Sequence, residues 1–222
     1  MQTTKQQILT LLKRAGGATI EEAAGSLSVA SMTARQHLVG LEKDGLVRAE
    51  KVKRATGRPH YLYSLTPKGQ EMFPRRYDIL AQLLLDEVAS LSPEEISGLA
   101  AAEKQSLLIC RVADRLTERH RPSLEGRPLA ERVAAATDVL HMVGGFAEWC
   151  PSEGGFEIRD YNCVFSRLRL EAEVGCEWHV RLLGGLLGRS VCHEVALDGW
   201  VECCRYLVYP DPEGAGEGNR RR

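Results

Sequence analysis

The sequence predicts an α+β protein in which a helical, basic N-terminal part is followed by a larger mixed part. Three observations lead to this class. Apolar residues near the N-terminus recur at helical spacing, with helix-starting and helix-ending residues between them. Two strand-like stretches then flank a Gly-Arg-Pro turn at 57–59. Beyond residue 125, helical segments alternate with pairs of strand-like segments.

Three helices are expected in the first 45 residues. Gly16 ends the first, Thr19 and Glu22 form a capping box that begins the second, and Gly45 ends the third. The third carries Ala34, Leu38 and Leu41 on one face, which predicts that this face is buried. The predicted helices span 4–15, 20–28 and 31–44.

Residues 46–66 predict a hairpin, which completes a winged helix-turn-helix. In that fold the third helix enters the DNA major groove and the hairpin, called the wing, lies along the phosphate backbone. Arg35 can pair with guanine and Gln36 with adenine, so these two are the candidates for reading bases. The predicted contacts to double-stranded operator DNA are Ser31, Thr33, Arg35, Gln36 and Lys43 in the helix, and Lys51, Lys53, Arg54, Arg58 and His60 in the wing.

The charge distribution agrees with a polyanionic partner for the first part only. Residues 1–75 hold twelve Lys and Arg against six Asp and Glu, although the whole chain has a formal net charge of −1. No apolar run reaches the roughly 20 residues needed to span a bilayer, and the N-terminus lacks the apolar stretch of a signal peptide. We therefore expect a cytoplasmic protein without a membrane partner.

The remaining segments predict a helical layer and a mixed domain. Helices are expected over 66–88 and 92–118, then over 129–145 and 177–187. Hairpins are expected around 151–155 and around 198–199. The predicted domains are a winged helix-turn-helix over 1–75, a helical linker or dimerisation region over 76–125, a sensor domain over 126–209 and a disordered tail over 210–222.

The wing and third helix resemble a known family. The stretches "SVASMTARQHLVGLEKDGLV" and "RATGRPHYLYSLTPKG" are similar to winged-helix regulators of the DeoR/ArsR-like group. The resemblance covers about the first third of the chain. It implies DNA binding and says nothing of the signal.

Seven cysteines in a cytoplasmic chain indicate packing, metal binding or redox chemistry more than structural disulfides. No Cys-x-x-Cys pair is present, which disfavours a zinc ribbon or ferredoxin loop. Cys163 is expected after a strand, Cys176 at a helix start, and Cys203 and Cys204 on the last strand, so an α+β fold could bring them together. The residue pattern alone leaves burial as small apolar groups, zinc binding, a thiol switch and an iron–sulfur site open. Cys110 and Cys150 are assigned to packing.

A second resemblance favours the iron–sulfur site. The order "YNCVF", "VGCEWHVRLLGGLLG" and "WVECCRY" is similar to the C-terminal half of SufR-type iron–sulfur-sensing repressors, in which a Cys-x12-Cys-x27-Cys arrangement binds the cluster. The resemblance implies that Cys163, Cys176 and Cys204 bind a cluster, of the 4Fe-4S type in preference to 2Fe-2S. It also implies a homodimeric repressor of cluster-assembly genes. Val164 and His179 depart from the family pattern, which has proline and glutamate there.

The fourth cluster ligand stays open, because neighbouring side chains on a strand point to opposite faces and Cys203 is next to Cys204. The candidates are Cys203, Cys192, His179, His193, Glu177 and an open site. An enzyme with Cys192 or Cys163 as nucleophile is disfavoured, because the sequence has no glycine-rich phosphate loop or nucleophile elbow. We therefore predict a regulator and not an enzyme.

Overall fold

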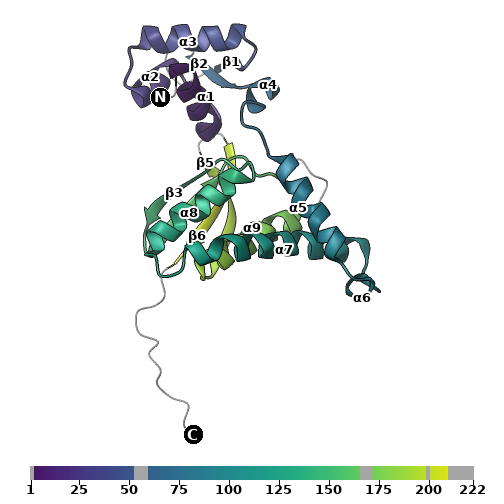
Figure 1. The fold of residues 1–222 in the computed structure, drawn as a ribbon. Helices are drawn as coiled ribbons and strands as arrows, with labels where there is room; N and C mark the ends of the chain where they lie inside the picture. The colour runs from purple at the N-terminus through teal and green to yellow at the C-terminus, as the bar shows by residue number, and fades with distance from the viewer. Residues whose placement is uncertain (1–2, 53–59, 166–171, 199–200, 210–222) are drawn as a thin grey trace. The chain divides into compact units, whose positions relative to one another are not determined.

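The structure, a computed structural model, describes residues 3–52, 60–165, 172–198 and 201–209. The chain divides into two compact units (Figure 1). The first comprises Met1–Pro74 with Val195–Cys203, and the second comprises Arg75–Glu194 with Cys204–Arg222. Helices and strands occur in both parts of the chain, so the predicted α+β class is confirmed.

The N-terminal module contains the three predicted helices, and local capping explains where the first two begin. The Thr3 and Thr19 side chains each accept a hydrogen bond from the backbone N–H of the third helical residue, Gln6 or Glu22. The side chain of that residue in turn accepts one from the backbone N–H of the threonine. Gly16 ends the first helix in the left-handed region, at φ 71°. The helices are α1 (Thr4–Ala15), α2 (Ile20–Leu27) and α3 (Ser31–Lys43).

The wing is an antiparallel pair of strands, β1 (Val47–Val52) and β2 (His60–Leu65), in the register Val47↔Leu65 to Val52↔His60. Ala18 and Tyr63 exchange two backbone hydrogen bonds of 2.9 Å, which attach the turn between α1 and α2 to β2. The short helix α4 (Pro67–Gln70) follows. A Cβ atom on its Gly69 would lie 2.0 Å from the Leu46 carbonyl oxygen, so only glycine fits there.

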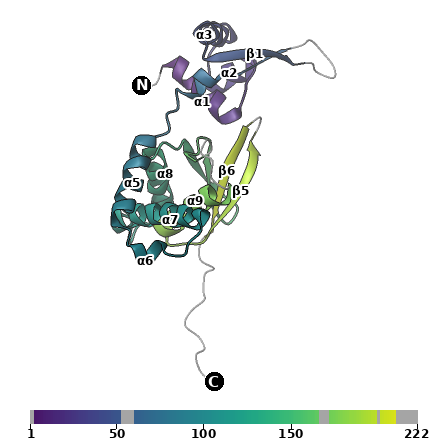
Figure 2. The same cartoon turned by 90° about the vertical axis from the view of Figure 1, so that its right-hand side faces the viewer.

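The second unit places helices on one side of a four-stranded sheet (Figure 2). The strand order is β3-β4-β6-β5, and β4 pairs antiparallel with both β3 and β6. The helices are α5 (Tyr77–Ser90), α6 (Pro93–Ile96), α7 (Ala101–His120), α8 (Leu129–Met142) and α9 (Ala172–Leu187), with a 3-10 turn at Arg121–Ser123. The strands are β3 (Ala147–Ser152), β4 (Gly155–Asp160), β5 (Val191–Asp198) and β6 (Val201–Val208).

Helices and sheet of this unit share one hydrophobic core. Leu116 of α7, Leu140 of α8 and Leu182 of α9 are buried against Ile158 and Tyr206 of the sheet. The residues predicted as a helical linker, 76–125, thus pack in the same core as the strands that follow them.

Several predicted boundaries were wrong for identifiable reasons. The helix expected over 66–88 is broken around Pro74, because proline cannot continue a helix, and the one over 92–118 is broken at Gly98, at φ 77°. The helix expected from Glu177 begins at Ala172, so Cys176 lies inside it and not at its start. Pro151, expected in a turn, pairs with Phe156 in the edge strand β3, where proline is tolerated.

Glu87 joins α5 to α7 through a largely buried carboxylate. It accepts hydrogen bonds from Arg111, at 2.8 Å, and from Arg115. Burial raises the pKa of Glu87, but the bonds from the two arginines outweigh burial, and the net pKa is lowered. The ionised carboxylate therefore stabilises the folded state.

We predict that Glu87→Gln lowers the free energy of unfolding by about 1–3 kcal/mol at neutral pH. The pKa of Glu87 is lower in the folded state than in the unfolded state. The loss of unfolding free energy should therefore have its full size above the unfolded-state pKa, and it should shrink as the pH falls through the folded-state pKa. Urea unfolding at pH 7, 5 and 3 measures this. Glu94→Gln, at an exposed position of α6, is the control, and a Glu87→Gln effect that does not change with pH would contradict the prediction.

Candidate functional site

The recognition helix α3 is held by an apolar face and offers a polar one. Ala34, Leu38 and Leu41 are almost fully buried against the core of the N-terminal module. Of the predicted contact residues on this helix, Thr33 is half-buried and the others are exposed: Ser31, Arg35, Gln36 and Lys43. The predicted base-reading side chains are therefore accessible.

On the wing, the structure describes two of the five predicted contact residues. Lys51 is exposed on β1 and His60 is half-buried on β2. Lys53, Arg54 and Arg58 lie outside the described residues. Lys51 pairs with Tyr61 and Val52 pairs with His60, so the two described wing residues lie near the same end of the ladder with their side chains on opposite faces of the hairpin.

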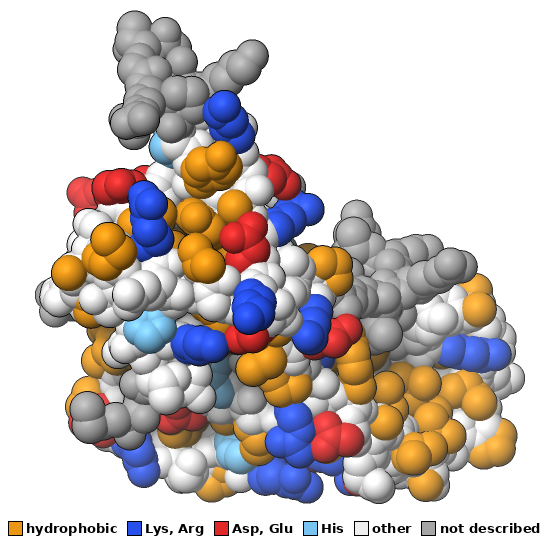
Figure 3. Space-filling model, turned by 90° about the horizontal axis from the view of Figure 1, so that it is seen from above, with side chains coloured by type: hydrophobic (Ala, Val, Ile, Leu, Met, Phe, Trp, Pro, Cys, Tyr) orange, Lys and Arg blue, Asp and Glu red, His pale blue; other side chains and the backbone are white. Residues whose placement is uncertain are grey.

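Among the exposed apolar side chains of this module that sequence reasoning missed are Met32, Val39 and Tyr61. Tyr61 pairs with Lys51 and lies on the same face of β2 as the buried Tyr63, because residues two apart on a strand share a face. The two-residue period alone therefore does not identify Tyr61 as a surface residue. Figure 3 shows that basic side chains on the face seen there are interspersed with acidic ones and not gathered into one patch.

The second unit brings together two of the predicted cluster ligands. Cys163 follows β4 and Cys204 lies on β6, where it pairs in register with Asp160, three residues before Cys163. A hydrogen bond joins the two half-buried thiol groups. Cys176 of α9 is also half-buried and interacts electrostatically with Cys204. We call these three residues the cysteine site.

Aromatic rings surround this site. His193 and His179 lie against the Tyr206 ring, with centroids 5.1 and 5.7 Å away. Trp178 is fully buried, with its centroid 4.7 Å from His179 and 5.2 Å from Phe165. The indole Nε1 of Trp178 has no hydrogen-bond partner among the described residues. Of these rings, those of His179, His193 and Tyr206 interact with the Cys204 thiol.

The surroundings favour a thiolate at one of the three positions. The pKa of the Cys204 thiol is lowered to about 5: the hydrogen bond from Cys163 is the largest cause, and His193, His179 and Tyr206 add to it against the raising effect of burial. The hydrogen bond with Cys204 and burial raise the pKa of Cys163, and burial raises the pKa of Cys176. A thiolate at Cys204 that accepts from the Cys163 thiol is the protonation state that this arrangement supports.

The candidates for a fourth ligand occupy different positions. His179 and His193 adjoin the site, whereas Cys203 lies on the opposite face of β6 from Cys204. Cys192 is exposed, and exposed Glu177 accepts a hydrogen bond from Ser106 at 3.5 Å. Within the described ranges, no group of three or more His, Cys, Asp or Glu side chains is placed to hold a metal ion.

The two cysteines assigned to packing differ from each other. Cys110 is half-buried on α7, and burial raises the pKa of its thiol. Cys150 is exposed on β3, so its assignment to packing was wrong: it lies on an edge strand whose residues are partly open to solvent.

Residues that orient the site were also missed by sequence reasoning. The Asp160 carboxylate accepts hydrogen bonds of 2.9 Å from the backbones of Phe146 and Asn162. The Arg75 side chain donates to the Cys163 carbonyl oxygen at 2.9 Å. The run "RDYNC" places Asp160 and Asn162 just before Cys163, a local signal that could have identified them, but no local signal connects Arg75 to residue 163.

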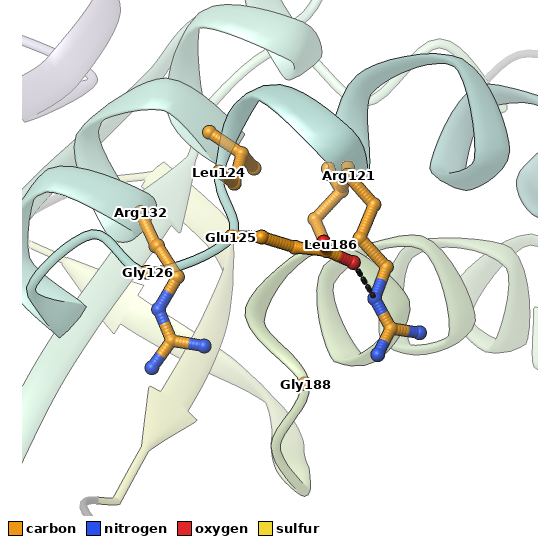
Figure 4. Close-up of a pocket in the computed structure, with 7 residues that line it drawn as sticks. All are labelled: Arg121, Leu124, Glu125, Gly126, Arg132, Leu186 and Gly188. Carbon is orange, nitrogen blue, oxygen red and sulfur yellow. Dashed lines mark ion pairs between the residues drawn. The ribbon is translucent and has the colours of Figure 1, made fainter.

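A small pocket of about 160 Å³ lies elsewhere in the second unit (Figure 4). The ion pair drawn in it joins two exposed side chains, Arg121 and Glu125, at 4.0 Å. Such exposed pairs contribute little energy, and the other described lining residues offer no cluster of reactive groups. The cysteine site is thus the stronger candidate in this unit.

Comparison with known proteins identifies the N-terminal module. Residues 5–52 match the DeoR-like helix-turn-helix domain. The chain therefore begins with a winged helix-turn-helix of the kind found in DNA-binding transcriptional regulators. No curated protein matches the chain.

Two solved structures are similar at low identity. MepR of S. aureus in complex with DNA is 23% identical and has a TM-score of 0.29; the match covers 43% of this chain and 69% of MepR. PadR of Bacillus subtilis in complex with operator DNA is 18% identical and has a TM-score of 0.30; the match covers 64% of this chain and 88% of PadR. Separately, none of the helices in the described ranges is long and apolar enough to cross a membrane.

The two kinds of DNA contact should respond differently to mutation. We predict that Lys51→Ala weakens binding to all DNA sequences alike and reduces the slope of log affinity against log salt by about 1, because one phosphate contact is lost. Arg35→Ala should instead cost about 1–3 kcal/mol on the preferred operator only. Fluorescence anisotropy at several salt concentrations measures both. The control is Lys104→Ala, at an exposed position of α7. An unchanged salt slope for Lys51→Ala would contradict its assignment as a phosphate contact.

Proposed function

We propose that the protein is a transcriptional repressor whose affinity for operator DNA is controlled by an iron–sulfur cluster held by Cys163, Cys176 and Cys204. The observation that carries the proposal is that Cys204 interacts with both other cysteines, although the three come from separate elements of the fold. The family resemblance of the C-terminal half adds the expectation that the regulated genes encode cluster assembly.

The donor set suits such a group. Thiolate sulfur is the ligand that iron–sulfur clusters use most often, and Cys204 has a lowered thiol pKa before any metal binds. The three thiols are half-buried, and the rings of His179, His193 and Tyr206 lie beside Cys204, which limits access of water there. Binding would require the three thiols to come closer together, since the described residues hold no preformed group of three metal ligands.

When bound, the cluster would supply iron–sulfur bonds that break on oxidation or iron loss. The chain's own part is to connect the ligands to separate elements: Cys163 to the end of β4, Cys176 to α9 and Cys204 to β6. Ligation of all three would fix the positions of these elements relative to one another. The second unit begins at Arg75, directly after the winged helix, so its geometry can set the spacing of two winged helices in a dimer. His179 and His193 are the nearest candidates for a fourth ligand.

Anaerobic treatment with ferrous iron and sulfide tests the proposal. We expect the wild-type protein to turn brown, with visible absorption and Mössbauer spectra of a 4Fe-4S cluster. Cys163→Ser, Cys176→Ser and Cys204→Ser should each stay largely colourless. Cys150→Ser, which removes an exposed cysteine outside the site, should colour like the wild type. A colourless wild type, or equal iron in all five proteins, would contradict the proposal.

A thiol switch is the second candidate, and the paired thiols of Cys163 and Cys204 favour it. A peroxide would oxidise one thiol to a sulfenic acid with release of water, and the other thiol would displace a second water to form a disulfide. Mass spectrometry would then find a loss of two hydrogen atoms in one linked peptide pair, without iron. Bound zinc is the third outcome, which elemental analysis would detect.

The partner that we propose for α5 is a second copy of the chain. Leu85 and Val88 are 63% and 53% exposed, and they share one helical face with Tyr77 and Ala81, opposite the buried Leu83. Exposed apolar side chains in such a row are typical of a helix that packs against another helix.

Leu85→Lys should therefore weaken the dimer by about tenfold or more, because a charge would be buried between the two helices. Sedimentation equilibrium measures the dissociation constant. The control is Gln105→Lys, which adds the same charge at an exposed position of α7. A wild-type protein that stays monomeric at micromolar concentration would rule out this interface.

A further inference from the structure

Three segments far apart in the sequence meet beside the cysteine site. The Arg75 guanidinium donates through Nε to the Cys163 carbonyl oxygen at 2.9 Å. The Asn162 side chain donates through Nδ2 to the Gly144 carbonyl oxygen, also at 2.9 Å. We call Arg75, Gly144, Asn162 and Cys163 the clasp. It connects the residues before α5, the end of α8 and the loop after β4.

Gly144 brings the end of α8 into direct contact with the backbone before α5. A Cβ atom at this position would lie 2.2 Å from the Arg76 nitrogen and 2.7 Å from the Arg75 Cα atom. Its φ of 93° also lies in the region that favours glycine. No other residue could make this contact, so the backbone of Arg75 and Arg76 is fixed against α8.

The loop side of the clasp is equally constrained. Asn162 is 1% exposed, and its backbone N–H is held by the buried Asp160 carboxylate. On the other side, the Arg76 carbonyl accepts the hydrogen bond of 3.1 Å from Leu80 N with which α5 begins. A displacement of the Cys163 backbone must therefore move Arg75 or break its hydrogen bond. The Cys163 thiol, in turn, is hydrogen-bonded to Cys204.

Arg75 is the first residue of the second unit, and it follows Pro74, the last residue of the winged-helix segment. We propose that Arg75 is a positioning residue: it couples the state of the cysteine site to the start of α5, the point at which the chain leaves the DNA-binding module. This inference rests on the proposed function in one respect: the signal that Arg75 would transmit is whether the cysteine site is occupied. The coupling that we propose has two states, one with the Arg75 hydrogen bond made, as in this structure, and one with it broken.

Hydrogen–deuterium exchange of the full chain tests the link without any metal. The site is perturbed by Cys204→Ser, which replaces the partner of the Cys163 thiol, and exchange is followed in peptides covering residues 76–80. In the wild-type background we expect Cys204→Ser to change exchange there by about threefold or more, as for a local opening. In the Arg75→Gln background the same replacement should change it by less than about 1.5-fold.

The neighbouring arginine supplies a matched control. Arg76 pairs with Asp78 at 2.7 Å and is exposed, so Arg76→Gln removes the same charge at the adjacent position and leaves the clasp bonds in place. Arg76→Gln should keep the full response to Cys204→Ser. If Arg75→Gln does not fold, Asn162→Ala opens the clasp from the other side and should also abolish the response.

The possible results separate this inference from the proposed function. A response that survives in Arg75→Gln, or one that is absent in the wild-type background, would overturn the coupling whatever the site binds. A wild-type protein that takes up no iron would contradict the proposed iron–sulfur cluster. The exchange measurements on these variants would still test whether Arg75 couples the cysteine site to the start of α5. A response lost in Arg75→Gln and kept in Arg76→Gln supports the coupling.

Discussion

The buried carboxylate of Asp160 is the constraint on which the cysteine site depends. One of its oxygens accepts two backbone hydrogen bonds, from Phe146 before β3 and from Asn162 just before Cys163. Hydrogen bonds to an ionised acceptor are among the strongest in proteins. Asp160 also pairs with Cys204 in the sheet. This one residue therefore fixes the conformation of the loop that carries Cys163 and also holds that loop beside β6.

This constraint explains how a site can be built from residues so far apart in the chain. The antiparallel pairing of β4 and β6 brings residue 160 next to residue 204, and the turn after β4 then directs Cys163 towards the same strand. Helix α9 contributes Cys176, while its buried Trp178 and Leu182 attach it to the core. The N-terminal module is simpler, because its helices pack against neighbouring segments and α1 and α2 begin at local caps.

The limits of prediction follow from this difference. The three N-terminal helices and the wing were predicted because caps such as Thr19 and breakers such as Gly45 act within a few residues. The break after α4 was missed, although Pro74 signals it, because the apolar pattern continues on both sides. The roles of Arg75 and Gly144 could not be predicted, because both depend on contacts with residues remote in sequence. Wing residues 53, 54 and 58 stay predictions, as do all ligands of the proposed cluster.

The central claim is that occupancy of the cysteine site changes operator affinity. The most direct measurement is the dissociation constant of one protein preparation for its own promoter fragment, by anaerobic fluorescence anisotropy, before and after removal of iron with a chelator. We predict that the iron-loaded form binds at least about tenfold more tightly, a difference of about 1.4 kcal/mol. Equal dissociation constants for the loaded and iron-free forms would contradict the account.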